Sequence, residues 1–237
     1  MKSARDLYGS RVGELAFVVG PGPSVLKAVR WLSEPHPMSY RIAINAAITK
    51  VPADYWLWID GLAYDMYKAH PNARAAIRLG RVGGESSYAD DPEVYGWEPA
   101  KTLPDDVQAL KILHRGTSLI AAINMAAIFG SPRIVIVGCD NTFTEEYNQA
   151  KLEEINRADP ERKETIERVR EFNLCTILRV NRAIREMPFW LPKWVTVRDA
   201  SGGDLPLLGT SIIRELEMLE AFYAKHSKPV LVLPEAV

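Results

Sequence analysis

The sequence contains little of what several common protein classes require. Only two cysteines, Cys139 and Cys175, occur among its 237 residues, too few for a disulfide framework or a zinc site. No apolar run approaches the ~20 residues that span a bilayer, and the first residues lack the apolar stretch of a signal peptide. We therefore expect a cytoplasmic protein with reduced thiols and no membrane span.

The chain also lacks an excess of charge of either sign. Its formal net charge is -1, so nothing in the composition favours general nucleic-acid binding. With 47% hydrophobic and 25% charged residues, the composition is that of a folded globular protein. We find no internal repeat and no linker, and predict a single domain over residues 1–237.

Residues 15–26, LAFVVGPGPSVL, contain the strongest local signal. The apolar run 15–19 predicts a buried parallel strand, because helices cover both faces of such a strand. Gly20 and Gly22 let the backbone turn sharply and approach a ligand closely, and Ser24 is expected to cap the next helix. Free amide groups at this helix N-terminus would suit a phosphate or carboxylate. The alternative is an ordinary tight turn without a ligand.

Polar residues follow the apolar runs elsewhere, where the predicted strands end. They are Asn45, Asp60, Asp140 and Ser201, the last followed by Gly202 in a glycine-rich strand end. Open α/β sheets bind ligands at the carboxyl ends of their strands, so we expect these residues to line one edge. Asn45 and Asp60 can instead cap the turn or helix that follows each of them.

The alternation of strand and helix patterns predicts an α/β protein with a Rossmann-like, doubly wound, mostly parallel sheet. Residues 62–80 have a helical pattern. Residues 81–104 are rich in Gly, Pro, Asp and aromatic residues and are expected to form an irregular binding loop or lid. Their aromatic residues, Tyr88, Tyr95 and Trp97, would either stack on a ligand or pin this loop to the core.

Residues 114–143 hold a second group of candidates. Thr117 or Ser118 is expected to cap an alanine-rich helix, which Gly130 ends. Arg115, just before this helix, is a ready partner for an anionic ligand.

The densely charged residues 144–190 predict a helical insertion or lid within the domain, made of two helices that separate near Asp159-Pro160. Most of its charges are expected to form a solvated face. Glu145, Glu146 and Tyr147 follow directly on the strand end at Asp140, so one of the carboxylates is a candidate general base. A closing helix at 211–225 and a tail strand at 230–233 complete the prediction.

Taken in order, these motifs resemble two glycosyltransferase families: the bacterial lipooligosaccharide sialyltransferases and the motility-accessory-factor flagellin glycosyltransferases. The resemblance rests on Gly20-x-Gly22-Pro23-Ser24, the strand-end Asn45, Arg115-x-Thr117-Ser118 and Gly138-x-Asp140. The Gly-Pro-Ser turn is also similar to that of the archaeal 6-hydroxymethyl-dihydropterin pyrophosphokinase. Together the motifs cover residues 16–143, with a further strand end at 199–203.

The resemblance implies a Rossmann-like transferase that binds a nucleotide at the carboxyl ends of its strands. The donor-binding residues it implies are Gly20, Gly22, Ser24, Asn45, Arg115, Thr117 and Ser118. This chain departs from the sialyltransferases by having Pro21 where they have an asparagine. It also has Tyr147, but no histidine between His114 and His226, where they use a histidine base.

The leading hypothesis is a nucleotide-sugar-dependent glycosyltransferase that moves a sugar to an acceptor hydroxyl, with the nucleotide sugar as its substrate. Asp140, Glu145 and Tyr147 are the catalytic candidates, and Asp60, Ser201 and Gly202 join the donor site. One alternative is a Mg²⁺-dependent diphosphokinase with the ion on Asp60 and Asp140. Another is a non-catalytic nucleotide- or sugar-binding module.

The sequence does not require a metal and leaves the donor base, the sugar and the acceptor open. It leaves a homo-oligomer open too, because four tryptophans suit a core or an interface between copies equally well. They are Trp31, Trp56, Trp97 and Trp190.

Overall fold

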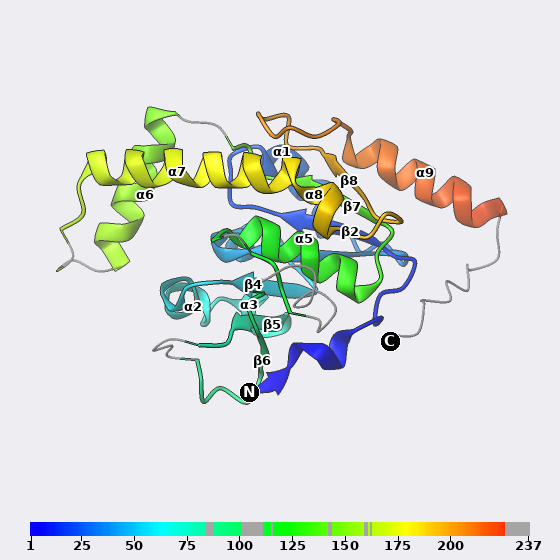
Figure 1. Ribbon diagram of the computed structural model, residues 1–237, viewed down its shortest axis with the longest axis horizontal. Helices are drawn as coiled ribbons and strands as arrows, with labels where there is room; N and C mark the ends of the chain where they lie inside the picture. The colour runs from blue at the N-terminus through cyan, green and yellow to red at the C-terminus, as the bar shows by residue number, and fades with distance from the viewer. Residues whose placement is uncertain are drawn as a thin grey trace.

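The computed structural model describes residues 1–83, 88–100, 111–114, 116–141, 144–158, 161 and 163–225. Its strands form one eight-stranded sheet in the order β1-β6-β5-β4-β3-β2-β7-β8. Every neighbouring pair in this sheet is parallel. Helices lie on both faces of the sheet (Figure 1). The prediction of a Rossmann-like, doubly wound α/β fold is confirmed.

The elements have the following bounds. The strands are β1 (Lys2–Ser3), β2 (Leu15–Val19), β3 (Ser39–Ile44), β4 (Tyr55–Trp58), β5 (Ile77–Arg81), β6 (Val94–Trp97), β7 (Arg133–Val137) and β8 (Thr196–Asp199). The α-helices are α1 (Val25–Ser33), α2 (Gly61–Tyr67), α3 (Pro71–Ala75), α5 (Ser118–Phe129), α6 (Glu145–Ala158), α7 (Ile166–Arg185), α8 (Met187–Trp190) and α9 (Ile212–Lys225). Two 3₁₀ segments are η1 (Ala4–Leu7) and η2 (Asn45–Thr49).

The order of the strands reverses between β2 and β7. From β2 the chain moves through β3, β4 and β5 to β6 in one direction, and then crosses back to place β7 on the other side of β2. Such a switch point leaves a crevice outside the carboxyl ends of the two strands, where open α/β sheets bind their ligands.

Strand β2 lies in the centre of the hydrophobic core, and all five of its residues are buried. Ala16 and Val18 pack on the side of α5 and α7, whereas Phe17 and Val19 pack on the side of α1. Because both faces are covered, the strand is apolar at every position.

Helix α5 is apolar around its whole circumference, as expected for a helix that is covered on every side. Nearly all its residues are buried, and it belongs to the same hydrophobic cluster as α7 and the sheet. Thr117 caps its N-terminus, with Oγ1 accepting a hydrogen bond from the Ile120 amide at 3.4 Å, and Gly130 ends it at φ 98°. Both predictions for this helix are confirmed.

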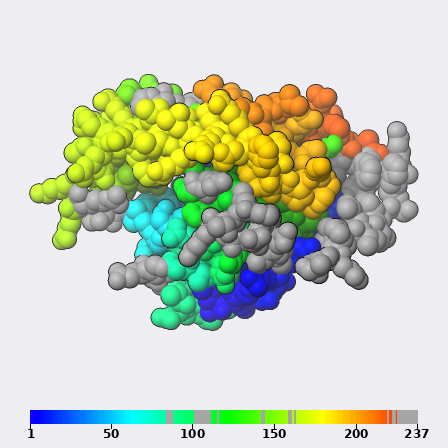
Figure 2. All heavy atoms as spheres, in the orientation of Figure 1, coloured from blue at the N-terminus to red at the C-terminus, as the bar shows by residue number. Residues whose placement is uncertain are grey.

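Residues 145–190 contain α6, α7 and α8, and the predicted break between two long helices is confirmed. Helix α7 crosses above α5 in Figure 1, and its N-terminal half extends with α6 beyond the sheet. The space-filling view in Figure 2 shows the yellow α7 along the upper part of this face. The C-terminal half of α7 packs on the core through Val180, Ala183 and Ile184.

Two strands occur where the sequence predicted something else. Residues 77–81 form β5, although the helical pattern was expected to extend to residue 80, and residues 94–97 form β6 inside the irregular loop expected over 81–104. Each strand contains a glycine. A neighbouring side chain occupies the space that a Cβ at this glycine would need. A Cβ at Gly80 would lie 2.7 Å from the Tyr88 ring, and one at Gly96 would lie 2.6 Å from Met1 Cε. These glycines remove the apolar alternation by which strands are recognised.

The aromatic residues of this region belong mainly to the core. Tyr88 and Trp97 are 1% and 2% exposed, and the Tyr88 hydroxyl donates a hydrogen bond to the Arg81 carbonyl at 2.7 Å. They therefore pin the loop rather than offer a stacking surface. Of the four tryptophans considered above, Trp31 is 37% exposed and the others are buried.

The predicted tail strand at 230–233 lies outside the described residues. In the part of the chain that is described, no helix combines the length and the apolar character that crossing a bilayer requires.

Candidate functional site at the switch point

The glycine-rich turn after β2 packs directly against the end of β7. The β2–β7 register pairs Val19 with Val137, so Gly20 to Gly22 lie beside Gly138 to Asp140. The Gly20 amide donates to the Val137 carbonyl at 2.7 Å and the Gly22 amide to the Gly138 carbonyl at 2.6 Å. The Ser24 amide donates to Asp140 Oδ2 at 3.2 Å.

These bonds correct two predictions about the turn. Its amides were expected to be free for a ligand, but Gly20, Gly22 and Ser24 all donate to the end of β7, and the two prolines have no N–H. Ser24 was expected to cap α1, but its side chain makes no capping bond. The Asp140 carboxylate takes that position instead, which suits the positive end of the helix dipole.

The two glycines are required by this close approach of β7. A Cβ at Gly20 would lie 2.3 Å from Cys139 Sγ, and a Cβ at Gly22 would lie 2.1 Å from Asp140 Oδ2. Burial raises the pKa of the Cys139 thiol, and the Asp140 and Asp199 carboxylates raise it further. Cys139 is therefore a protonated packing residue and not a nucleophile.

Ser201 fastens the end of β8 to the end of β7. Its hydroxyl accepts a hydrogen bond from the Cys139 amide at 3.1 Å, and its own amide donates to Asp199 Oδ1 at 2.8 Å. Burial raises the pKa of Asp199 despite the hydrogen bonds from Ser201, and the Asp140 charge raises it further. Gly202 adopts φ 71° and has open space where a Cβ would be. Ser201 therefore positions the strand end on which Asp140 lies.

Asn45 lies beside the glycine-rich turn on the other flank of β2. The β2–β3 register pairs Val19 with Ala43, so Asn45 is the neighbour of Pro21. Its φ of 48° is left-handed, a conformation that asparagine tolerates better than most residues. Asn45 Oδ1 and Ser24 Oγ are both buried without a hydrogen-bond partner among the described residues. Buried polar atoms normally have partners, so these two oxygens are unused hydrogen-bonding capacity next to the switch point.

A charged cluster lies beside the same turn. The Lys50 ammonium donates a hydrogen bond to the Pro21 carbonyl. On α6, Glu154 accepts one hydrogen bond from the Tyr67 hydroxyl and another from Lys151 Nζ at 2.8 Å. The Lys50 charge interacts with Asp140 and with Glu154, so this cluster connects α6 to the strand ends.

The surroundings shift the pKa values of this cluster. Burial lowers the pKa of Lys50, and the Asp140 and Glu154 charges offset only part of that shift. Burial raises the pKa of Glu154, but Lys151, Tyr67 and Lys50 together outweigh it, and the net pKa is lowered.

Tyr147 extends this cluster along α6. Burial of its hydroxyl raises its pKa, as do the Glu154, Cys139 and Asp140 charges, while Lys151 opposes the shift. The residue as a whole is 37% exposed, so the hydroxyl points inward from an accessible ring. The Tyr147 hydroxyl is therefore within range of the Asp140 charge.

The remaining candidates lie in different surroundings. Asp60 caps α2, with Oδ1 accepting from the Ala63 amide at 3.1 Å, and its charge reaches Tyr67. Thr117 caps α5, and Ser118 is the first residue of that helix. The exposed Glu145 carboxylate binds Arg170, with a shortest distance of 2.6 Å. Arg115 lies outside the described residues.

Sequence reasoning missed Lys50, Tyr67, Lys151 and Glu154. Tyr147, Lys151 and Glu154 are spaced four and three residues apart, which places them on one face of a helix. That spacing was available in the sequence, but the charge run around it predicted a solvated face. No sequence pattern marked Lys50 as a site residue, because it reaches the Pro21 carbonyl only through the fold of the 3₁₀ segment η2 that precedes it.

Among the described residues, no three or more His, Cys, Asp or Glu side chains are grouped so that they could hold a metal ion. Comparison with known protein families, curated proteins and solved structures finds no match for the chain. The interpretation of the site therefore rests on its own geometry.

Proposed function

We propose that the protein is a nucleotide-sugar-dependent glycosyltransferase whose donor binds at the switch point between β2 and β7. The observation that carries this proposal is a pair of buried oxygens, Ser24 Oγ and Asn45 Oδ1, which follow the ends of the neighbouring strands β2 and β3 and have no hydrogen-bond partner among the described residues. A carbonyl oxygen of asparagine accepts hydrogen bonds only. Its natural ligand is therefore a donor such as a ribose hydroxyl or a base amino group.

The donor phosphate needs positive charge, because the amides of the turn are occupied. Lys50 is the cation beside the turn, and it is joined to it through the Pro21 carbonyl. Its lowered pKa reflects the burial of its charge, and a partly desolvated cation binds an anion more strongly than one in water. We assign Lys50 to the donor phosphate, with Arg115 as the second cation that the motif implies.

The transfer step needs a base for the acceptor hydroxyl and a way to stabilise the leaving phosphate. Asp140 uses Oδ2 to cap α1, and no other described group donates a hydrogen bond to its carboxylate, so Oδ1 is the candidate base. The acceptor oxygen forms a bond to the anomeric carbon and gives its proton to Asp140. The bond from that carbon to the phosphate oxygen breaks, and its electron pair stays on the phosphate.

Tyr147 is the residue that we assign to stabilising the leaving phosphate. Its raised pKa keeps the hydroxyl protonated, so it can donate a hydrogen bond to the leaving phosphate as charge develops there. Glu154 is not available as a base, because Tyr67 and Lys151 occupy both of its oxygens. Its role would be to hold α6 over the site.

The test is a thermal-shift series with CMP, CDP, UDP, GDP, ADP and ATP, each with and without Mg²⁺. A ligand that binds only the folded state raises the midpoint by mass action. We expect a shift with a cytidine or uridine nucleotide, reduced by Lys50→Met but not by the exposed control Lys193→Met. A shift with ATP and Mg²⁺ alone would favour diphosphate transfer. No shift with any nucleotide would overturn the proposal.

Binding without catalysis is distinguished in a second assay. The nucleotide sugar with the base identified above is incubated with the protein, and release of free nucleotide is measured. Asp140→Asn should lower this release far more than it lowers nucleotide binding. Binding with no release in the wild-type protein would favour the non-catalytic module.

A further inference from the structure

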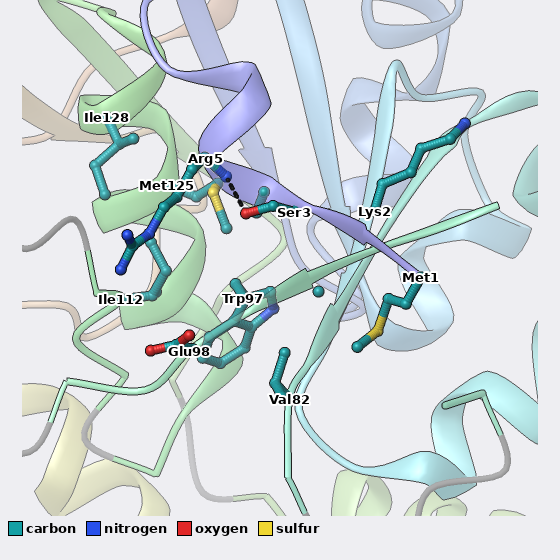
Figure 3. Close-up of a pocket in the computed structure, with 12 residues that line it drawn as sticks. Met1, Lys2, Ser3, Arg5, Val82, Trp97, Glu98, Ile112, Met125 and Ile128 are labelled. Atoms are coloured by element: carbon teal, nitrogen blue, oxygen red, sulfur yellow. Dashed lines mark hydrogen bonds between the residues drawn. The ribbon is translucent and has the colours of Figure 1, made fainter. Parts of the chain in front are cut away.

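A pocket lies away from the switch point, at the edge of the sheet formed by β1 and β6. It is a cavity of about 210 Å³, lined by residues of β1, η1, β6 and α5. Figure 3 shows Trp97 near its middle, with Arg5 and Glu98 on one side and Met1 and Val82 on the other. No residue assigned above to the donor site lines this pocket.

Two buried N–H groups, one on the lining residue Trp97 and one on its strand neighbour Arg81, have no acceptor among the residues that the structure describes. Trp97 is 2% exposed, and its Nε1 has no hydrogen-bond partner in the described part of the chain. Arg81 is the register partner of Trp97 on β5, and its Nε is likewise buried without a partner. Paired residues on neighbouring strands lie on the same face of a sheet. Leaving buried donors unsatisfied costs free energy, so an acceptor from a ligand would stabilise both.

The charges around the pocket favour a negatively charged ligand. Arg5 lines it opposite Glu98, the single carboxylate among the lining residues, and Lys2 also belongs to the lining, with its ammonium 5.2 Å from the centre of the Tyr95 ring. Arg5, Arg81 and Glu98 make no ion pair with any described residue. The Arg81 charge also contributes, after burial, to the lowered pKa of His114, so its positive charge acts on this end of β6. A surplus of positive charge next to unsatisfied N–H donors is what an oxyanion requires.

The other side chains that line the pocket are apolar and favour a ligand with a hydrocarbon portion. Val82, Ile112, Met125 and Ile128 line the cavity. Its volume lies below the roughly 300 Å³ at which pockets for drug-sized molecules begin. The ligand must therefore be small, with one anionic end and a short hydrocarbon portion.

We propose that this pocket binds a small aliphatic carboxylate. The carboxylate accepts hydrogen bonds from Trp97 Nε1 and Arg81 and pairs with Arg5, while the hydrocarbon chain packs on Ile112 and Met125. This site is independent of the proposed glycosyltransferase activity. It lies on the β6 side of the sheet, and β5, β4 and β3 separate β6 from β2.

The experiment titrates the protein with 4-methylpentanoate and follows the tryptophan indole N–H resonances by ¹H–¹⁵N NMR. Trp97→Phe assigns the Trp97 resonance and removes the donor while it keeps an aromatic ring. We expect this resonance to move on titration. The neutral analogue 4-methylpentan-1-ol should bind about tenfold more weakly, because it lacks the charge-assisted bonds. An unmoved Trp97 resonance, or equal affinity for the alcohol, would overturn the proposal.

Matched variants locate the binding. Arg81→Gln and Arg5→Gln should each weaken binding of 4-methylpentanoate by about tenfold, and Glu98→Gln should strengthen it. Arg74→Gln, an exposed arginine on α3, is the control and should leave affinity unchanged. Unchanged affinity in Arg81→Gln would overturn the proposal, as would tighter binding of inorganic phosphate than of the carboxylate.

Lys50→Met separates this inference from the proposed function. It should impair nucleotide binding and leave 4-methylpentanoate binding intact. Loss of carboxylate binding in Lys50→Met would show that the ligand occupies the switch point, and would overturn the assignment of this pocket.

Discussion

The Asp140 carboxylate caps helix α1 from a neighbouring strand, with Oδ2 accepting a hydrogen bond from the Ser24 amide at 3.2 Å. Ser24 itself, at the N-cap position, makes no side-chain capping bond. The capping carboxylate belongs to Asp140, whereas Ser24 stands at the N-cap position. Mutation of each residue can therefore test the contribution of Asp140 to stability separately from that of Ser24 to binding.

The first prediction concerns stability. Asp140→Ala should lower the free energy of unfolding by roughly 0.5–2 kcal/mol, the usual cost of losing an N-cap, measured by urea denaturation. Ser24→Ala should leave this free energy almost unchanged, because its hydroxyl has no partner to lose. Under the proposed function, Ser24→Ala would instead weaken nucleotide binding. A large stability loss in Ser24→Ala with none in Asp140→Ala would contradict this account of the cap.

The strands differ in how clearly the sequence predicts them. β2 and β7 are continuous apolar runs because helices bury both their faces, and such runs are easy to recognise. β5 and β6 are short and contain glycines that neighbouring side chains require. Whether a glycine in a short segment belongs to a loop or to a crowded strand depends on residues far away in the chain, so the local pattern could not decide it.

The candidate site was predictable to a similar extent. The strand ends at Asn45, Ser201 and Asp140 follow from the parallel topology, which brings all carboxyl ends to one edge. The hydrogen-bond acceptors of the glycine-rich turn could not be predicted in this way, because its amides donate to the end of a strand that lies more than a hundred residues later in the chain. The roles of Lys50 and Glu154 depend on the path of α6 across the site, which no local pattern determines.

A second prediction concerns how α6 is held. Tyr67→Phe removes the hydroxyl that donates to Glu154, and should increase amide hydrogen exchange in α6. The loss of one such bond costs about 0.5–1.5 kcal/mol, so global stability should change little. Tyr95→Phe is the control, because the Tyr95 hydroxyl makes no hydrogen bond to a described residue, and exchange in α6 should match the wild type. Equal exchange in both variants would show that α6 is held by other contacts.

A third prediction follows from the lowered pKa of Lys50. At a given alkaline pH, a larger fraction of Lys50 than of an ordinary lysine is the unprotonated, nucleophilic amine. Competitive acetylation across a pH series, read by mass spectrometry, should give a titration midpoint for Lys50 below that of Lys193. The midpoint is compared rather than the absolute rate, because burial also limits access of the reagent. A midpoint at or above that of Lys193 would contradict the burial of this charge.

The fourth prediction concerns acid stability and His114. Burial lowers the pKa of His114, and the Arg81 charge lowers it further, while its Nδ1 accepts a hydrogen bond from the Gly116 amide at 2.9 Å. The folded state therefore binds its proton less readily than the unfolded state, so this residue's contribution to stability is present above a pH of about 6.5. It is lost as the pH falls through the folded pKa.

His114→Asn should reduce that loss, because an asparagine oxygen can replace Nδ1 as acceptor and does not titrate in this range. The measurement is the thermal midpoint of both proteins at pH 7.5 and at successively lower pH. The wild type should lose more of its midpoint on acidification than the variant does. NMR titration of the His114 ring gives the pKa directly, and a value above that of a free histidine would reverse the sign and refute the prediction.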